Sequence, residues 1–405
     1  MNAPAKIVVR NLVKVFGTRP ELALQMLSQG THKDEIFKQT GQIVGVQNAS
    51  FEIQSGEIFV IMGLSGSGKS TMIRLLNRLL EPTAGEVLVD GQNVASMDKR
   101  ALIDLRRRDM SMVFQSFALM PHRTVLENAA FGLEVAGTDR AAREKRAMEV
   151  LEQVGLGPFA RKRPSELSGG MQQRVGLARA LAVNPSLMLM DEAFSALDPL
   201  KRHEMQRVLL DLQRDHKRTI VFVSHDLDEA FRIGDRIAIM EGGTVVQVGE
   251  PHEIARNPAN DYVKAFFHGV DLTRHLTVGD IARTDQVPVF PVPSDIGHEF
   301  TAAIDHLRSI KRNYGFVVDS SSHLVGVVSI DSLLRCISKS KPDLAGALLE
   351  HVPALTGASQ FREVLGQVAK NPHPFPVVDS NGIYIGAVTQ TILLEHLCEE
   401  ESSHA

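Results

Sequence analysis

The chain has 405 residues, of which 43% are hydrophobic and 23% are charged, and its formal net charge is −4. This length predicts two or three globular domains, and the lack of a basic excess argues against nucleic acid as the main partner. The two cysteines match neither a metal site nor a disulfide framework, which favours a reducing compartment. We find no signal-peptide core and no run of about 18 apolar residues, so any role at a membrane is expected to depend on a partner.

The N-terminal part of the chain predicts two strands separated by an insertion. Residues 6–16 alternate between apolar and polar side chains, as a half-buried strand does. Residues 17–45 break this pattern with two short helical stretches, so we expect a helical insertion there. Residues 58–62 form an apolar run typical of a strand buried on both faces, and they lead through a glycine-rich loop to a helix expected at 71–80.

The middle of the chain predicts an α/β domain with a largely parallel sheet. Residues 99–165 are mostly charged and helical in pattern, so we expect an inserted helical subdomain. Buried-strand runs return at 187–190 and 220–223, and a hairpin is predicted at 236–248. Because strands alternate with helices, we expect one domain to span residues 1–268.

The C-terminal third contains an internal repeat. Residues 315–334 resemble residues 374–394 when the sequence is shifted by 60 positions. The residues of the first copy that recur in the second are Val317, Val318, Asp319, Ser320, Gly326, Val328, Leu333 and Leu334. One copy cannot bury both of its faces, so we expect two units, 277–338 and 342–398, to pack together. An acidic tail, 399–405, ends the chain.

A phosphate-binding loop is predicted after the strand at 58–62. The pattern Gly-x-x-x-x-Gly-Lys-Ser matches the P-loop motif, whose glycines let backbone N–H groups turn toward phosphate oxygens at a helix N-terminus. We expect Lys69 to bridge the β- and γ-phosphates and the Ser70 hydroxyl to bind Mg²⁺. The nucleotide-binding residues predicted here are Gly63, Leu64, Ser65, Gly66, Ser67, Gly68, Lys69, Ser70 and Thr71.

An acidic pair follows the apolar run at 187–190. Asp191 and Glu192 lie where the carboxyl end of a buried strand approaches phosphates in a parallel sheet. We expect Asp191 to hold Mg²⁺, directly or through water, and Glu192 to polarise the attacking water. The alternative is a buried strand that ends in two solvated acids, but the P-loop in the same chain favours the catalytic interpretation.

A second anion site is predicted at the start of a later helix. Ser168, Gly169 and Gly170 offer a hydroxyl and backbone N–H groups that a ligand can approach closely. Since the P-loop already surrounds one nucleotide, we expect this second site to serve a nucleotide held by another copy of the domain.

Residues 167–174, LSGGMQQR, resemble the signature of ATP-binding-cassette (ABC) ATPases, whose two domains sandwich two ATP molecules head to tail. The resemblance implies that Phe16 stacks on adenine and that Gln115 belongs to a glutamine loop that serves catalysis and Mg²⁺. It also implies that Asp198 lies in the loop that crosses the dimer and that His225 senses the γ-phosphate. Taken singly, Phe16 and His225 would be ordinary core or hydrogen-bonded residues, and only the shared order of the motifs favours these roles.

Longer segments resemble a narrower family, the ATPase subunits of bacterial glycine betaine/proline betaine importers. These segments are QSFALMPHRTVLEN, MDEAFSALDPL and SHDLDEAFRIGDRIAIM, together with the insertion after Phe16. The resemblance implies an α/β fold: an ABC-type P-loop nucleotide-binding domain with an inserted helical subdomain, followed by a tandem pair of cystathionine-β-synthase (CBS) domains. Residues 119–124 follow the glutamine loop, and we expect them to dock a permease helix.

The same resemblance implies ATP-driven uptake of a quaternary amine through a separate membrane permease, which receives its substrate from a binding protein. The subunit would work as a dimer, peripheral on the cytoplasmic face of the inner membrane. Betaine, choline, carnitine and proline stay open as substrates, because an ATPase subunit need not touch the transported molecule. A soluble ABC ATPase and a nucleotide-sensing regulator are the alternative functions.

The two repeats depart from the nucleotide-binding form of the CBS module. That form often carries Gly-x-x-Ser/Thr-x-x-Asp. Here Asp331 follows Ser329 one position early, and Ile392 follows Thr389 where the acid is expected. We therefore weigh a packing and dimerisation role for the repeats equally with a sensory role.

Overall fold

The computed structural model describes residues 4–115, 117–195, 197–267, 274, 276–293, 295–339, 342–350 and 352–395. The chain divides into two compact units, Met1–Phe267 and His268–Ala405. The tail expected at 399–405 lies outside the described residues. Within the described part of the chain, no helix has both the length and the apolar character needed to cross a membrane.

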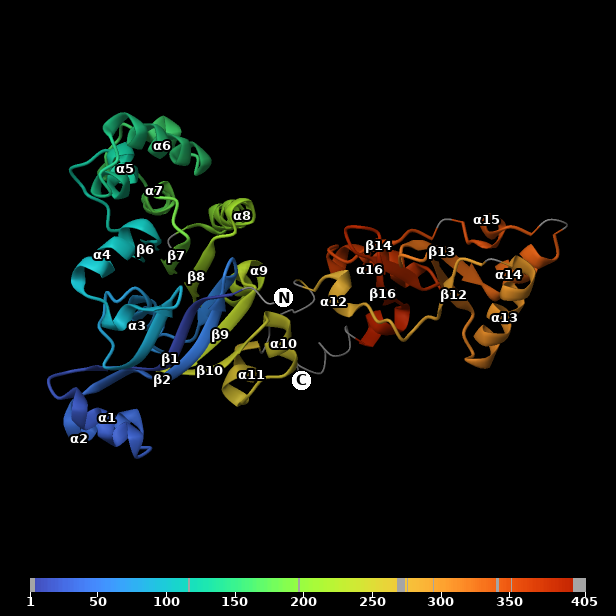
Figure 1. Cartoon of the computed structure of the whole chain (residues 1–405), viewed down its shortest axis with the longest axis horizontal. Helices are drawn as coiled ribbons and strands as arrows, with labels where there is room; N and C mark the ends of the chain where they lie inside the picture. Colours follow the sequence, from blue (N-terminus) through green and yellow to red (C-terminus); the bar gives the residue numbers. More distant parts are fainter. Residues whose placement is uncertain are drawn as a thin grey trace. The chain divides into compact units, whose positions relative to one another are not determined.

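The first unit begins with a four-stranded antiparallel sheet in the order β2-β1-β4-β5. Its strands are β1 (Ala5–Phe16), β2 (Ile43–Gln54), β4 (Ala84–Val89) and β5 (Gln92–Asn93). Two helices follow β1, namely α1 (Pro20–Ser28) and α2 (Lys33–Thr40), at one end of this sheet (Figure 1). The insertion expected at 17–45 is corrected at its end, because residues 43–45 already belong to β2, where Val44 packs in a small core with residues of the helices.

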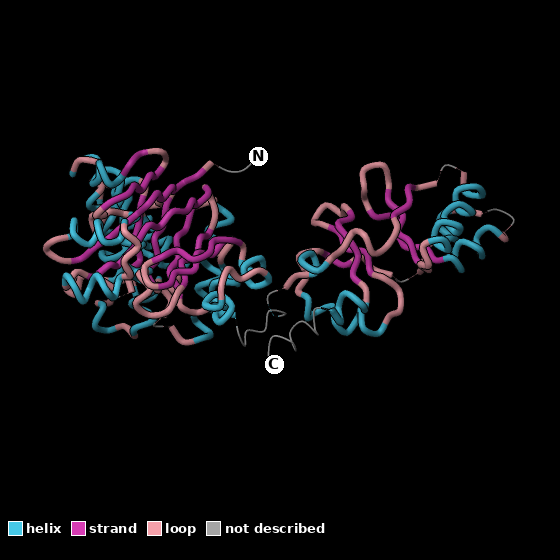
Figure 2. The backbone as a smooth tube through the Cα atoms, turned by 90° about the horizontal axis from the view of Figure 1, so that it is seen from below, coloured by secondary structure: helices cyan, strands magenta, loops and turns pink. Residues whose placement is uncertain are grey.

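A six-stranded sheet forms the middle of the first unit, in the order β10-β9-β3-β8-β7-β6. Its strands are β3 (Ile58–Met62), β6 (Met110–Val113), β7 (Leu187–Asp191), β8 (Thr219–Ser224), β9 (Arg236–Glu241) and β10 (Thr244–Gly249). Strands β9, β3, β8, β7 and β6 are parallel, and only β10 is antiparallel to its neighbour. Figure 2 shows the strands gathered in the middle of this unit with helices around them. The carboxyl ends of the buried strands β3, β7 and β8 therefore meet at one edge, where ligands bind in open parallel sheets.

Three helices of the first unit pack on one another, and Figure 1 shows them as a separate helical part. They are α5 (Val125–Val135), α6 (Arg140–Gln153) and α7 (Gly169–Ala182). The helical subdomain was expected at 99–165, and the structure corrects both of its limits. Toward its start, Met110–Val113 forms strand β6, which pairs with β7. Beyond its expected end, α7 packs with α5 and α6. Strand β6 was missed because a run of four residues between charged segments is too short to show a period.

The remaining helices of the first unit are α3 (Lys69–Leu76), α4 (Lys99–Arg108), α8 (Pro199–His216), α9 (Leu227–Ile233), α10 (Pro251–Arg256) and α11 (Asp261–Phe267). The helix expected at 71–80 is α3, which starts and ends earlier than predicted. Gly68, with a φ angle of 100°, precedes its first residue, and Arg78, with a φ angle of 54°, lies in the left-handed region beyond its end. These two conformations fix the limits of the helix.

The second unit contains two three-stranded sheets of the same design. Their strands are β11 (Val289–Pro291), β12 (Tyr314–Val318) and β13 (Leu324–Ser329) in one, and β14 (Leu355–Thr356), β15 (Phe375–Val378) and β16 (Tyr384–Val388) in the other. The helices are α12 (Val278–Ile281), α13 (Ile296–Ser309), α14 (Ile330–Ile337), α15 (Leu344–Ala347) and α16 (Phe361–Lys370). Val317 pairs with Gly326 as Val377 pairs with Gly386, so the two copies share one register.

The two copies pack against each other, as the repeat predicted. The N–H of Leu324 donates to the carbonyl of Gly382, and the N–H of Tyr384 donates to the carbonyl of Ser322. A shared core contains residues of both copies: Val287, Phe316, Val327 and Ala387. Each copy therefore buries a face that it could not bury alone.

Candidate nucleotide site

The P-loop connects β3 to α3 through three glycines with positive φ angles. These angles are 154° at Gly63, 79° at Gly66 and 100° at Gly68, in regions that residues with a Cβ atom seldom adopt. A Cβ atom added at Gly63 would collide with the carbonyl oxygen of Met240, and one added at Gly68 would lie 2.5 Å from the carbonyl oxygen of Gly45. Conformation therefore favours glycine at all three positions, and space requires it at Gly63 and Gly68.

Lys69 lies inside the P-loop and is 6% exposed. Its Nζ donates to the carbonyl oxygens of Gly63 at 2.8 Å and Leu64 at 2.9 Å. Burial lowers the pKa of the Lys69 ammonium, whereas the nearby carboxylates of Glu192 and Asp191 act in the opposite direction. A cation enclosed by the loop in this way can bind the oxygens of a phosphate.

Ser70 and Asp191 meet from α3 and the end of β7. The Ser70 hydroxyl donates to Oδ1 of Asp191 at 2.9 Å, and Asp191 is fully buried. Arg74 lies 3.3 Å from Oδ2 of Asp191. We did not predict Arg74, although its spacing of four residues from Ser70 places both side chains on one face of α3. A hydroxyl and a carboxylate at this distance fit the preference of Mg²⁺ for oxygen ligands.

Glu192 directly follows β7 and contacts residues that come after β6 and β8. Its Oε2 accepts a hydrogen bond from Nε2 of Gln115 at 2.8 Å, and its Oε1 lies 3.6 Å from Nδ1 of His225. Glu192 has a φ angle of 48°, and its N–H donates to the carbonyl of Val223 on β8. Unusual backbone conformations of this kind concentrate at functional sites. The Glu192 side chain is 17% exposed and that of His225 is 62% exposed, so the acid is sheltered while the histidine can reach a ligand.

The three residues predicted to bind Mg²⁺ are not equally placed. Ser70 and Asp191 are hydrogen-bonded to each other, whereas the amide nitrogen of Gln115 contacts Glu192. The structure therefore brings together two separate groups, Ser70 with Asp191, and Gln115 with Glu192 and His225.

Phe16 lies at the end of β1, beside the first turn of α3. A Cβ atom added at Gly45 would lie 2.6 Å from Cε2 of Phe16 and 3.4 Å from Cγ2 of Thr71. The three residues are therefore neighbours, and Gly45 on β2 leaves the space that the ring occupies. No motif in the sequence includes Gly45, so we did not predict it. The aromatic ring predicted to stack on adenine thus lies next to the last residue of the P-loop.

The second predicted anion site lies in the helical part. Ser168 caps α7 by accepting the N–H of Met171, and Gly169 is the first residue of the helix. A Cβ atom added at Gly170 would lie 2.9 Å from Leu197, and Asp198 caps α8. Among the described residues these contacts do not include the P-loop, so one chain does not bring this site to its own phosphate loop.

A cavity of about 590 Å³ lies beside the first half of the P-loop. It is lined by His32, Lys33, Gln47, Leu64, Ser65, Gly66, Ser67, Glu241, Gly242, Thr244, Val246 and Tyr262. The inserted helix α2 therefore contributes a wall beside the phosphate loop. The Tyr262 hydroxyl accepts the N–H of Leu64 at 3.5 Å and donates to the carbonyl of Met240 at 3.2 Å. We did not predict Tyr262, because no sequence signal connects a residue of α11 with a loop 198 positions away.

Comparison with known proteins identifies the family. The ABC transporter family profile matches residues 46–195. The chain is 51% identical, over 98% of both chains, to the glycine betaine/proline betaine transport system ATP-binding protein ProV of Salmonella typhimurium. It is 46% identical, over 93% of both chains, to the glycine betaine/carnitine transport ATP-binding protein GbuA of Listeria monocytogenes. A solved ATP-binding cassette, dimeric and bound to ADP and Pi in a post-hydrolysis state, is 33% identical and has a TM-score of 0.53, covering 60% of this chain and 98% of that chain. The chain therefore belongs to the ABC transporter family, as an ATP-binding subunit.

Proposed function

We propose that this ABC subunit hydrolyses ATP to drive the import of a quaternary amine osmolyte through a separate membrane permease. The contact of Glu192 with Gln115 and His225 carries the hydrolytic part of this proposal. Similarity to glycine betaine transport proteins over nearly the full length, including the second unit, supports the substrate class. Glycine betaine and proline betaine are the first candidates, followed by choline and carnitine.

The side chains of the site divide the chemistry of phosphoryl transfer among them. Lys69 neutralises charge on the β- and γ-phosphates, and Glu192 orients the attacking water and accepts its proton. Gln115 fixes one oxygen of Glu192, and His225, on the open side, contacts the γ-phosphate. A bound Mg²⁺ ion, held by Ser70 and Asp191 with Gln115 nearby, would supply positive charge to the phosphate oxygens.

The remaining predicted nucleotide contacts follow from the same arrangement. The adenine stacks on Phe16, next to Thr71, and the phosphates lie in the P-loop. Ser168, Gly169 and Gly170 bind the nucleotide of a second copy, and Asp198 lies in the loop between the two copies. The dimeric state of the solved cassette supports this assignment.

Residues 119–124 provide the contact with the permease. Pro121 and His122 are exposed, while Arg123 is held by Glu134 through a hydrogen bond of 2.8 Å and lies over the ring of Phe131. The fixed arginine holds the loop so that its exposed part can bind a cytoplasmic helix. A binding protein delivers the substrate to the permease, and the subunit lies peripherally on the cytoplasmic face of the membrane.

The second unit is a pair of CBS domains, 277–338 and 342–398, that regulates the ATPase. Residues 396–398 of the second domain lie outside the described residues. Two copies with a common register and a shared core support this assignment.

Reconstituted uptake tests the proposal. The subunit is isolated from solubilised membranes together with the polytopic protein that co-purifies with it, and the complex is placed in vesicles. We expect ATP-dependent accumulation of labelled glycine betaine, which the Glu192→Gln variant abolishes. Hydrolysis of ATP without any associated membrane protein would favour a soluble ABC ATPase, and binding of ATP without hydrolysis would favour a nucleotide sensor.

A further inference from the structure

The backbone around His225 is held on both sides of this residue. Strand β8 ends at Ser224 and helix α9 is capped by Asp226, so His225 is the single residue between them. The His225 side chain is 62% exposed, and burial therefore does not hold its ring in place. The positions of Ser224 and Asp226 consequently determine where the ring can lie.

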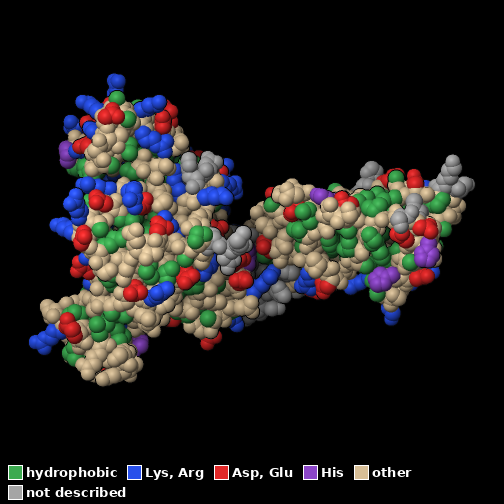
Figure 3. Space-filling view, viewed as in Figure 1, with side chains coloured by type: hydrophobic (Ala, Val, Ile, Leu, Met, Phe, Trp, Pro, Cys, Tyr) green, Lys and Arg blue, Asp and Glu red, His purple; other side chains and the backbone are tan. Residues whose placement is uncertain are grey.

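Helix α8 holds Asp226 through an ion pair. Nη1 of Arg202 donates to Oδ2 of Asp226 at 2.9 Å. Figure 3 shows many Lys and Arg side chains on the surface of the first unit, but the side chain of Arg202 is only 27% exposed and that of Asp226 is 32% exposed. A charge-assisted hydrogen bond between partly buried groups is stronger than an ion pair on the open surface. The other oxygen of Asp226 accepts the N–H of Glu229 at 3.2 Å, so the carboxylate is fixed by two contacts.

The same helix holds Ser224 through a buried chain of hydrogen bonds. Nε2 of Gln206 donates to Oε1 of Glu229 at 3.1 Å, and the Ser224 hydroxyl donates to Oε2 of Glu229. The Ser224 hydroxyl also accepts the N–H of Asp226 at 3.0 Å, across His225. Gln206, Glu229 and Ser224 are all buried. Removing the Gln206 donor would therefore leave a buried carboxyl oxygen without this partner, which costs free energy.

The first half of α8 is anchored in the core of the first unit. Met205 and Leu209 are buried. They lie on the face of the helix that also carries Arg202 and Gln206, because the four residues are spaced by three and four positions. The apolar side chains of this face thus fix the helix, and its polar side chains reach the residues around His225.

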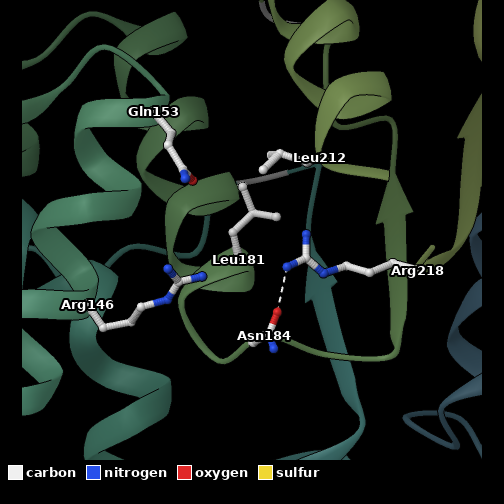
Figure 4. A pocket seen from close by; sticks show the side chains of 6 residues that line it. All are labelled: Arg146, Gln153, Leu181, Asn184, Leu212 and Arg218. Atoms are coloured by element: carbon white, nitrogen blue, oxygen red, sulfur yellow. Dashed lines mark hydrogen bonds between the residues drawn. The ribbon is translucent and has the colours of Figure 1, made fainter. Parts of the chain in front are cut away.

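The second half of α8 borders a cavity. Figure 4 shows Leu212 at the edge of this space of about 240 Å³, which Leu181 of α7 and Arg218, directly before β8, also line. Side chains that face a cavity lose part of their packing contacts. The support for His225 therefore comes from the first half of the helix.

We propose that Arg202 and Gln206 are positioning residues for the hydrolysis of ATP. By holding Asp226 and Glu229, they keep His225 where its ring meets the γ-phosphate, and they act without touching the nucleotide. The inference rests on the proposed role of His225 in hydrolysis. It adds two residues of α8 that no sequence motif selected.

Turnover of the purified full chain and its affinity for ATP separate this role from a binding role. We expect Arg202→Gln to lower kcat about tenfold while KM for ATP changes less than about twofold. Gln206→Met keeps a similar volume without an N–H donor, and it should lower kcat in the same way. Arg202→Lys should restore most of kcat, because Arg202 uses one N–H group in its contact with Asp226. A rise in KM at unchanged kcat would overturn the proposal.

A double-mutant cycle with His225→Ala tests the route of the effect. If Arg202 acts through His225, Arg202→Gln should change single-turnover hydrolysis by less than about twofold in the His225→Ala background. A tenfold loss in both backgrounds would show that Arg202 supports the fold or another part of the site, and the proposal would then be wrong.

Arg214→Gln is the matched control. Arg214 is an arginine of the same helix, and it lies 3.9 Å from Asp211 in an exposed ion pair. We expect its kcat to equal that of the unmodified chain, and equal losses in Arg202→Gln and Arg214→Gln would overturn the proposal. Normal turnover of Arg202→Gln and Gln206→Met beside an active unmodified chain would contradict this inference alone. Absence of hydrolysis by the unmodified chain would contradict the proposed function, and this inference with it.

Discussion

Carboxyl groups in the two units of this chain illustrate two different uses of polar side chains. The first unit buries carboxyl groups, and burial raises the pKa of Glu57, Glu229 and Asp235. In the second unit, hydrogen bonds from backbone N–H groups lower the pKa of Asp319 and Asp379, which lie on the surface. These three carboxyl groups of the first unit are therefore held against the cost of burial, whereas the two of the second unit fix its own backbone.

The repeated residues of the second unit show this structural use most clearly. Oδ1 of Asp319 accepts the N–H groups of Ser321 and His323, and Asp379 makes the same pair of bonds in the other copy. Ser329 caps α14, and the hydroxyl of Thr389 accepts the N–H of Ile392. Equivalent polar positions of the copies thus form turns and helix caps, and they teach that a repeated polar residue is not by itself a ligand-binding residue.

The largest effect is expected from Glu192→Gln. Removing the carboxylate leaves no base for the attacking water, so hydrolysis should slow by at least about a hundredfold while ATP still binds. Steady-state turnover and binding of a fluorescent ATP analogue measure the two properties. A chain that ends at Phe267 is the control, and its turnover should remain near that of the full chain. Near-normal turnover of the Glu192→Gln variant would contradict the role of Glu192 as the base, and with it the contrast between a catalytic first unit and a structural second unit.

Mixed dimers test whether the helix start at Ser168 belongs to the nucleotide site of a partner. A Lys69→Ala chain paired with a Gly169→Asp chain has one site with both changes and one intact site. We expect ATP-dependent closure in the mixed dimer and its loss in either homodimer, because aspartate places negative charge at a helix start that binds phosphate. Energy transfer between labelled chains measures closure, and normal closure of the Gly169→Asp homodimer would contradict the model of a shared site.

A smaller effect is expected from Ser329→Ala. The hydroxyl of Ser329 accepts the N–H of Ser332 at 3.0 Å, so its loss should destabilise the second unit by about 1 kcal/mol. Urea unfolding measures this change, and ATP turnover should not change. Ser338→Ala is the control, because Ser338 is an exposed serine after the same helix. If Ser329→Ala changed ATP turnover without changing stability, the Ser329 hydroxyl would have a functional role and not the structural role expected here.

The smallest effects are changes in pH dependence, and they should have opposite signs in the two units. Glu229 is buried with Ser224 and Gln206, and its folded-state pKa is raised above the usual 4.5. The stability linked to this group is therefore present below about pH 4.5 and is lost as the pH rises through the folded-state pKa. Glu229→Gln should remove this loss. The thermal midpoint of the variant should therefore rise relative to that of the unmodified chain as the pH increases.

Asp379→Asn is the counterpart in the second unit. Its folded-state pKa is lowered below the usual 3.8, so its contribution is present above that pH and is lost as the pH falls through the folded-state pKa. The midpoint of the variant should therefore lie below that of the unmodified chain at neutral pH, and the two should converge in acid. If the difference in thermal midpoint between variant and unmodified chain changed with pH in the same way for Glu229→Gln and Asp379→Asn, the two units would not differ in this respect.

The parts of the fold that sequence could predict are those with long, strong patterns. Strands β3, β7 and β8 were recognisable because they are continuous apolar runs, and the repeat was recognisable from its identical residues. Strand β6 was not recognisable, because its four residues lie between charged segments. Its place in the sheet depends on its pairing with β7. Long-range pairing of this kind leaves no local period.

The candidate site shows the same division. Motif spacing was sufficient to select Lys69, Asp191 and Glu192, whose roles stay predictions until they are measured. Arg74 could have been found from its helical spacing to Ser70. Tyr262 could not, because a hydrogen bond across 198 positions depends on the completed fold.

That hydrogen bond from α11 has a mechanical consequence. Helix α11 has seven residues, and the first unit ends at its last residue, Phe267, whose ring packs edge-on against Phe231. Tyr262 lies near the other end of the helix and touches both the P-loop and the end of β9. Contacts near both ends therefore hold α11 in place, and its Tyr262 end supports the loop that encloses Lys69.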